Sequence, residues 1–322
     1  MKVYPIKFNP ILKEKIWGGN KLKQVLLKDT NKKNVGESWE ISDVNGNVSV
    51  VSNGIYKGSN LKELIKEHKS NFLGVKNFEN FGYNFPLLIK FLDAKTDLSV
   101  QVHPDNEMAK KYHDSFGKTE MWYIMDSDEG ADIVLGLKDK TTNPEVLNHI
   151  TSVNLDTIFN REQVTKGESF FIPAGKIHAI GAGVLAAEIQ QTSDITYRVY
   201  DWDREDDNGQ KRELHTKLAE KATKQFESNG KSDYVIGKDD MANLVNCEYF
   251  TTNILELSNT QEKNYKHLDS FIIFMCVEGK VDITVGEQTE TLITGETIIL
   301  PANTQHVVFN SNSSKLLEVY IS

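Results

Sequence analysis

The sequence contains one stretch in two copies, Gly167-Glu-Ser-Phe-Phe-Ile-Pro-Ala-Gly-Lys-Ile-His178 and Gly295-Glu-Thr-Ile-Ile-Leu-Pro-Ala-Asn-Thr-Gln-His306. Gly, Glu, Pro, Ala and His stand at the same offsets in both copies, and each copy is a short apolar run between turn residues. Upstream of each copy another apolar run ends in Glu-Gly, at Glu129-Gly130 and at Glu278-Gly279. This repetition predicts two related β-domains.

Many short apolar runs between Gly or Pro turns favour a sandwich or barrel over a parallel α/β sheet, because regular strand–helix alternation is absent. We therefore expect a mainly β protein with two β-barrel halves, at residues 1–225 and 226–322, whose boundary falls between Asp206 and Ala242. Helices are expected only in inserts: Ser59 to Lys69 with Asn60 as its cap, a helix starting at Asn143-Pro, a short one over Leu155 to Phe159, and Glu213 to Phe226.

Composition limits the class of protein. The chain has 322 residues, 39% of them hydrophobic, which is enough to bury a large core. Its formal charge of -9 argues against a nucleic-acid or anionic-membrane partner, since both require a basic surface. Only Cys247 and Cys276 occur, which excludes a disulfide framework, and they lack the Cys-x-x-Cys spacing of a structural zinc site. We expect a soluble cytoplasmic protein, because no signal peptide or long apolar run is present.

Polar residues beside the apolar runs suggest a metal site. Residues 98–103 alternate apolar and polar, so Gln101 and His103 point to one face of a strand. Glu120 opens the apolar run that follows it, and His178 lies just past the run Ser169-Phe-Phe-Ile, which ends at Pro-Ala-Gly. Imidazole and carboxylate suit a divalent zinc-like ion, and three protein ligands leave positions open for water or substrate. A single histidine is more often a surface or hydrogen-bonded core residue, so the interpretation depends on the coincidence of these side chains.

Five segments, taken in order, carry a family resemblance. They resemble class I mannose-6-phosphate isomerase in its compact bacterial form: Trp17-Gly-Gly, Leu98-Ser-Val-Gln-Val-His-Pro-Asp105, Gly117-Lys-Thr-Glu-Met-Trp122, Ile172-Pro-Ala-Gly-Lys-Ile-His-Ala179 and Tyr197-Arg-Val-Tyr-Asp-Trp202. The resemblance implies two cupin-type jelly-roll barrels and a zinc-dependent interconversion of mannose 6-phosphate and fructose 6-phosphate. The implied partner is a small phosphorylated sugar, and a monomer and a homodimer both remain open.

The resemblance also assigns metal ligands. Carried over residue by residue, they fall on Gln101, His103, Glu120 and His178, with one zinc ion per chain. Gln101 has an alternative role, because an amide oxygen is a weaker ligand and can instead hydrogen-bond the substrate or another ligand.

Two cations match active-site residues of the family. Arg198 is expected to hold phosphate or to stabilise negative charge on the substrate, the alternative being a salt bridge to Asp194 or Asp201. Lys118 lies two residues before Glu120, hence on the same strand face, and is interpreted as a substrate-contacting cation. The family often has proline where this chain has Thr119.

Aldose–ketose isomerisation needs an acid–base group, because hydrogen moves between C1 and C2 through an enediol-like intermediate. Glu188 lies on a predicted strand leading toward Arg198 and is our candidate base, although a buried structural carboxylate fits the pattern equally. Trp17 either walls the substrate pocket or is a packing residue, and it is not assigned to the site.

The second repeat copy is predicted to be structural. His306 keeps the position of His178, but no His-Pro or Lys-Thr-Glu segment precedes it, which leaves only His267 and Asp269 as further ligands. Two rival functions remain for the first half: an iron-dependent cupin oxygenase, which uses the same His/His/carboxylate set, and a non-catalytic sugar-binding cupin. Lys118 and Arg198 favour the isomerase.

Overall fold

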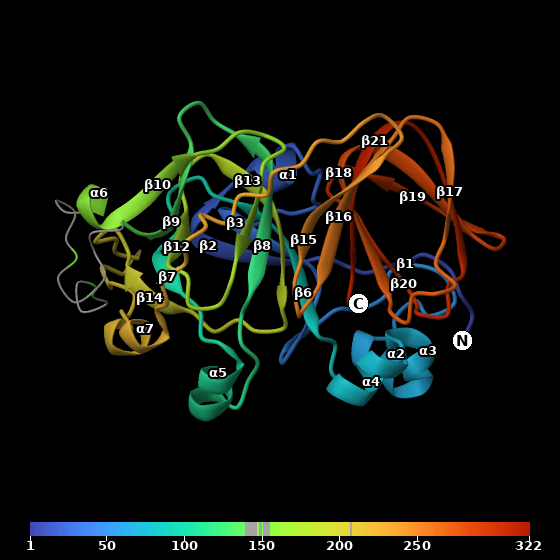
Figure 1. Cartoon of the computed structure of the whole chain (residues 1–322), viewed down its shortest axis with the longest axis horizontal. Helices are drawn as coiled ribbons and strands as arrows, with labels where there is room; N and C mark the ends of the chain where they lie inside the picture. The colour runs from blue at the N-terminus through green and yellow to red at the C-terminus, as the bar shows by residue number, and fades with distance from the viewer. Residues whose placement is uncertain (139–146, 148–149, 151–154, 207) are drawn as a thin grey trace.

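The computed structural model describes residues 1–322 apart from 139–146, 148–149, 151–154 and 207. Three large sheets with antiparallel pairing dominate it (Figure 1). The six-stranded sheet has the order β11 (Ser169–Ile172), β8 (Glu120–Ser127), β13 (Val184–Gln191), β6 (Leu87–Asp93), β3 (Val35–Ile41), β2 (Ile11–Gly19). The five-stranded sheet has the order β10 (Phe159–Gln163), β9 (Asp132–Leu137), β12 (His178–Ile180), β7 (Val100–Val102), β14 (Tyr197–Tyr200).

The C-terminal residues form the third sheet. Its order is β1 (Ile6–Lys7), β20 (Thr297–Leu300), β18 (Ile272–Val285), β21 (His306–Tyr320), β16 (Thr251–Leu257), β15 (Met241–Asn246), with β17 (Thr260–Asn264) paired to β21 and β19 (Gln288–Ile293) to β18. A small ribbon joins β4 (Asp43–Val44) to β5 (Asn47–Val48). The first strand of the chain, β1, therefore completes the sheet that is otherwise built by the C-terminal part.

Short helices lie outside the sheets. They are α1 (Lys21–Gln24), α2 (Leu61–His68), α3 (Ser70–Leu73), α4 (Val75–Phe81), α5 (Asn106–His113), α6 (Leu155–Ile158) and α7 (Thr216–Ala222). Helices α2 to α4 form a group beside the eight-stranded sheet (Figure 1). No described helix is both long enough and apolar enough to cross a membrane.

Two cores meet at the six-stranded sheet. One core lies against the eight-stranded sheet and α2 and takes Ile89 and Phe91 from β6. Successive residues of a strand point to opposite faces, so Lys90 and Leu92 face the other way, toward the five-stranded sheet. A second core, which includes Trp122 and Phe170, fills the rest of that space. The whole of β6 is buried because both of its faces are covered.

The strands predicted from the sequence are present, whereas some of the predicted helices differ in length. The runs at Val100, Glu120 and Ser169 form β7, β8 and β11, and the mainly β class is confirmed. The short helix predicted over Leu155 to Phe159 is α6, and the helix predicted over Glu213 to Phe226 is shorter, as α7. The helix start predicted at Asn143 lies outside the described residues. Both cysteines are free.

The helix predicted after Ser59 is present as α2 and begins with a capping box. The Asn60 side chain accepts a hydrogen bond from Glu63 N at 3.0 Å, and Asn60 N donates to the Glu63 carboxylate at 2.9 Å. The chain stays helical beyond the predicted end at Lys69, as α3 and α4, and the positive φ of Lys69 and Gly74 turns it between successive helices.

We predict that Asn60→Ala lowers the free energy of unfolding by about 1 kcal/mol, because the first turn of α2 loses its cap. Urea unfolding measures this loss. Lys66→Ala, at an exposed position of the same helix, is the control and should change stability by less than about 0.5 kcal/mol. Equal losses in the two variants would contradict a specific capping role.

Candidate active site

A pocket between the six-stranded and five-stranded sheets collects most of the predicted site residues. On the five-stranded sheet, Gln101 pairs with His178 on one side and with Arg198 on the other. On the six-stranded sheet, Glu188 pairs with Trp122 and with Lys90. Side chains directly opposite each other in antiparallel strands project from one face. The two sheets therefore present two facing polar rows.

His103, Glu120 and His178 come together behind Lys118 and Gln101, two residues that line the pocket, and all three are buried. The two imidazole Nε2 atoms are 3.1 Å apart. Glu120 Oε1 lies 3.3 Å from His178 Nε2, and Glu120 Oε2 lies 3.5 Å from His103 Nε2. These are three of the four ligands predicted from the sequence, and among the described residues they are the single His/Cys/Asp/Glu group compact enough to hold a metal ion.

Backbone carbonyls determine the tautomer of both histidines. His103 Nδ1 lies 2.9 Å from the carbonyl oxygen of Ile195, and His178 Nδ1 lies 2.8 Å from that of Lys176. A carbonyl only accepts, so each Nδ1 carries the hydrogen and each neutral ring presents a lone pair at Nε2. Burial also holds the pKa of His103 well below its ordinary value and lowers the pKa of His178 to about 3. Two lone pairs thus face each other across 3.1 Å.

The cluster fits a divalent metal ion. Ligand atoms about 2.0 to 2.1 Å from a zinc ion are about 2.9 to 3.4 Å from one another in octahedral or tetrahedral geometry, close to the separations found here. Both Glu120 oxygens are buried, and neither accepts a hydrogen bond of normal geometry from a described residue. Buried polar atoms normally have partners. The three side chains therefore have the donor atoms and the spacing of a metal site, and the Glu120 carboxylate also has unmet bonding capacity.

Lys118 lies beside the same cluster. Its ammonium is 3.0 Å from His103 Nε2 and 3.1 Å from Glu120 Oε2. It also lines the pocket, as expected from its position two residues before Glu120. Burial raises the pKa of Glu120, and the neighbouring Lys118 ammonium opposes that rise.

Gln101 lies at the edge of the cluster. Its side-chain amide is 3.4 Å from His178 Nε2, and the residue lines the pocket. An amide nitrogen and oxygen are distinguished only by their bonding partners, so this distance fits both roles considered for Gln101, that of ligand and that of hydrogen-bonding neighbour.

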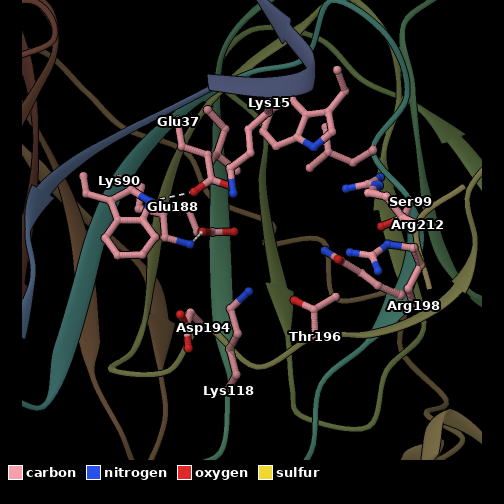
Figure 2. A pocket seen from close by; sticks show the side chains of 15 residues that line it. Lys15, Glu37, Lys90, Ser99, Lys118, Glu188, Asp194, Thr196, Arg198 and Arg212 are labelled. Carbon is pink, nitrogen blue, oxygen red and sulfur yellow. Dashed lines mark hydrogen bonds and ion pairs between the residues drawn. The ribbon is translucent and has the colours of Figure 1, made fainter. Parts of the chain in front are cut away.

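Arg198 lies on one wall of the pocket with Arg212 and Ser99 (Figure 2). Its Nη1 donates to the carbonyl oxygen of Glu213 at 2.8 Å, and its buried Nε has no partner among the described residues. The alternative salt bridge to Asp194 or Asp201 is not formed. Asp201 instead pairs with Arg204 at 2.6 Å and with Arg212. Burial and the adjacent Arg212 lower the pKa of Arg198, as expected where two cations are crowded together.

Glu188 lies on the opposite wall (Figure 2). Its Oε2 pairs with Lys90 Nζ at 2.8 Å, and its Oε1 accepts a hydrogen bond from Trp122 Nε1 at 3.1 Å. Burial would raise the pKa of Glu188, but the Lys90 and Lys118 ammoniums outweigh it and hold that pKa below the usual value. The carboxylate is therefore ionised and faces the pocket.

Sequence reasoning missed several lining residues. Ser99 shares the strand parity of Gln101 and His103, so the alternation that identified them could have identified it as well. Trp17, left unassigned, also lines the pocket. Lys90 and Arg212 carried no local signal, because they reach the pocket through strand register and a loop after β14.

The second repeat copy forms no comparable cluster among the described residues. The His306 side chain is 53% exposed and pairs with Glu262, whereas that of His178 is 1% exposed. Asp269 accepts hydrogen bonds from Val75 N and Lys76 N at the start of α4. The equivalent histidine therefore points to solvent.

We predict that Zn²⁺ added to chelator-treated protein raises its thermal unfolding midpoint, because a ligand that binds only the folded state stabilises it by about 2.7 kcal/mol at a hundredfold excess over Kd. His178→Ala, with folding checked by circular dichroism, should lose the shift. His306→Ala, at the matching repeat position, should keep it. A shift that survives His178→Ala would place zinc elsewhere.

Comparisons of the sequence with known proteins point to one family. The family model for the catalytic domain of type I phosphomannose isomerase matches residues 6–141, and that for the cupin domain of mannose-6-phosphate isomerase matches residues 240–321. Mannose-6-phosphate isomerase of Streptococcus mutans is 37% identical over 92% of each chain. Mannose-6-phosphate isomerase ManA of Bacillus subtilis is 36% identical over 94% of each chain.

Solved structures have the same fold. The crystal structure of mannose 6-phosphate isomerase from Bacillus subtilis superposes with a TM-score of 0.87 at 34% identity, covering 98% of this chain and 99% of that one. A mannose 6-phosphate isomerase bound with zinc and yttrium superposes with a TM-score of 0.78 at 17% identity over 99% of each chain, a likeness of fold. Because these curated relatives match almost its full length, the chain belongs to the type I phosphomannose isomerase family.

Proposed function

We propose that this protein is a zinc-dependent aldose–ketose isomerase that interconverts mannose 6-phosphate and fructose 6-phosphate. The observation that carries the proposal is the buried His103–Glu120–His178 cluster, which contacts Lys118 and Gln101 in the lining of a pocket whose wall holds two arginines. Family membership supplies the substrate, and the pocket has the charges that this substrate requires.

The arginine wall suits the phosphate of the substrate. Arg198 and Arg212 lie side by side with the Ser99 hydroxyl, and the Arg198 Nε retains a free donor among the described contacts. Guanidinium groups bind phosphate through paired hydrogen bonds, and a dianion relieves the repulsion between two neighbouring cations. We assign this wall to the phosphate, which orients C1 and C2 toward the metal cluster.

The ligands proposed for zinc are His103, Glu120 and His178, with Gln101 as the weaker fourth. We propose one ion per chain, because His306, the counterpart of His178 in the second repeat copy, is exposed and belongs to no metal-binding cluster among the described residues. The zinc named in a structural relative agrees with this donor set. When bound, zinc acts as a Lewis acid that polarises the substrate oxygens. Lys118 would exchange its contacts with His103 and Glu120 for a substrate oxygen and neutralise charge there.

Glu188 is the proposed base. Its carboxylate faces the pocket and is kept ionised by Lys90 at 2.8 Å, which is the form that accepts a proton at neutral pH. It would remove the proton from C2 of the aldose and return it to C1, while a second proton passes from the C2 hydroxyl to the C1 oxygen, so that an enediol-like intermediate becomes the ketose. The Trp122 indole fixes one carboxylate oxygen at 3.1 Å, so the group is held in one orientation.

We also propose the two-barrel division at residues 1–225 and 226–322, each half a cupin-type jelly roll. The cupin-domain match to residues 240–321 supports it, as does the eight-stranded sheet, which takes only β1 from the N-terminal part. Because sugar phosphates are metabolised in the cytoplasm, we place the protein there.

The function is tested by measuring conversion of mannose 6-phosphate to fructose 6-phosphate before chelation, after it and after zinc is restored. We expect activity to be lost and then recovered, and unphosphorylated mannose to react far more slowly because it lacks the group that the arginine wall binds. Absence of conversion in every metal state would refute the isomerase. Oxygen uptake with ferrous iron would then favour the oxygenase alternative.

For the base, we predict that Glu188→Gln lowers kcat at least about 100-fold, since general-base catalysis contributes roughly 10²- to 10⁴-fold. Zinc content should stay at the wild-type level, because Glu188 is not a ligand. Turnover comparable to that of the wild type would assign Glu188 to the structural alternative.

A further inference from the structure

Thr119 lies between Lys118 and Glu120 and is held at three points. Its Oγ1 accepts a hydrogen bond from Ala174 N at 3.1 Å, in the loop that leads to His178. Its carbonyl oxygen accepts from Gln191 N at 3.1 Å, and its own N–H donates to Gln191 Oε1 at 2.9 Å. Lys118 and Glu120 flank this residue, so the orientation of its peptide groups sets where both side chains point.

The Gln191 side chain is buried, and hydrogen bonds at both its oxygen and its nitrogen fix the orientation of the amide. Its Oε1 faces the N–H of Thr119, which can only donate, so the Nε2 must be the atom that contacts Asn106 Oδ1 at 3.0 Å. Asn106 Oδ1 also accepts from Gly117 N at 2.8 Å. The two amides together hold both ends of residues 117–119, the segment that leads into the Glu120 ligand.

We propose that Gln191 is a positioning residue for the metal centre, which acts by holding Glu120 and Lys118 in place through the Thr119 peptide. The proposal rests on the metal site proposed above. Among the described residues the Gln191 side chain bonds to Thr119 N and Asn106 Oδ1 and to none of the three ligands. Without its acceptor, however, the buried Thr119 N–H loses its partner, which is destabilising. The start of β8 would then relax, and the carboxylate would no longer match the two imidazoles.

The same contacts extend to the C-terminal part of the chain. Asn106 Nδ2 donates to the Tyr249 hydroxyl at 3.4 Å, and Asn106, Gln191 and Tyr249 line one cavity beside α4. The support for the ligand segment is therefore built jointly by β13, α5 and a residue next to the eight-stranded sheet. This gives the C-terminal part a role in the geometry of a site to which it contributes no ligand.

The test compares three variants of the full-length zinc enzyme. Gln191→Leu removes both amide contacts at similar volume. Asn106→Asp keeps the acceptor for Gly117 N and Gln191 Nε2 and is the conservative variant. Asn77→Leu is the matched control, because Asn77 is an equally buried amide that bonds Leu73 O and Ser270 Oγ without contacting residues 117–120. Zinc Kd, from competition with a chromogenic chelator, is measured with kcat, KM and the thermal midpoint.

We expect Gln191→Leu to weaken zinc binding about 10- to 100-fold, as for other partners that orient a metal ligand. Its kcat should fall while KM for mannose 6-phosphate changes little, because the arginine wall belongs to the other sheet. Asn106→Asp should keep the wild-type zinc Kd and kcat. Asn77→Leu should lower the thermal midpoint and leave zinc Kd and kcat unchanged. Folded Gln191→Leu with wild-type zinc affinity and kcat would overturn the proposal, as would equal zinc loss in Asn77→Leu. A wild-type protein that binds no zinc would instead refute the metal site itself.

Discussion

The site depends on one electrostatic constraint: two imidazole lone pairs and a buried carboxylate converge at one point, and one ammonium, that of Lys118, lies beside them. His103 and His178 are fixed as Nδ1–H tautomers by the carbonyls of Ile195 and Lys176, so their Nε2 atoms face each other 3.1 Å apart. Such an arrangement is stable only with a positive charge nearby. Lys118 supplies one positive charge in the described structure, and a divalent ion would satisfy all three ligands at once.

The loops that carry these ligands are joined to one another by the backbone. Gly175 N donates to His103 O at 2.9 Å, and Lys118 N donates to Pro104 O at 3.1 Å. The segments that carry His103, Glu120 and His178 come from two facing sheets. Each sheet presents its own set of polar side chains to the pocket between them. The five-stranded sheet presents Arg198, Gln101 and His178 in one row, and the six-stranded sheet presents Glu188 and Lys90 opposite. The proposed phosphate-binding residues and the proposed base thereby lie on different walls of one pocket.

Local pattern was enough to identify the side chains that cluster. Gln101 and His103 follow from strand parity, Glu120 from its place before an apolar run, and His178 from its place after an apolar run that ends at Pro-Ala-Gly. Lys90 was not predictable, because it enters the pocket only through the register of β6 against β13. Likewise, nothing near Ile6 indicates that β1 pairs with β20. Such long-range pairings depend on the complete fold, which short motifs do not encode.

The most direct measurement of the central claim is a zinc titration of metal-free protein, with mannose 6-phosphate isomerisation followed after each addition. If the His103–Glu120–His178 cluster is the catalytic metal site, activity rises in proportion to added zinc and stops rising at one equivalent per chain. Full activity in the metal-free protein, or a plateau only at two equivalents, would contradict the account.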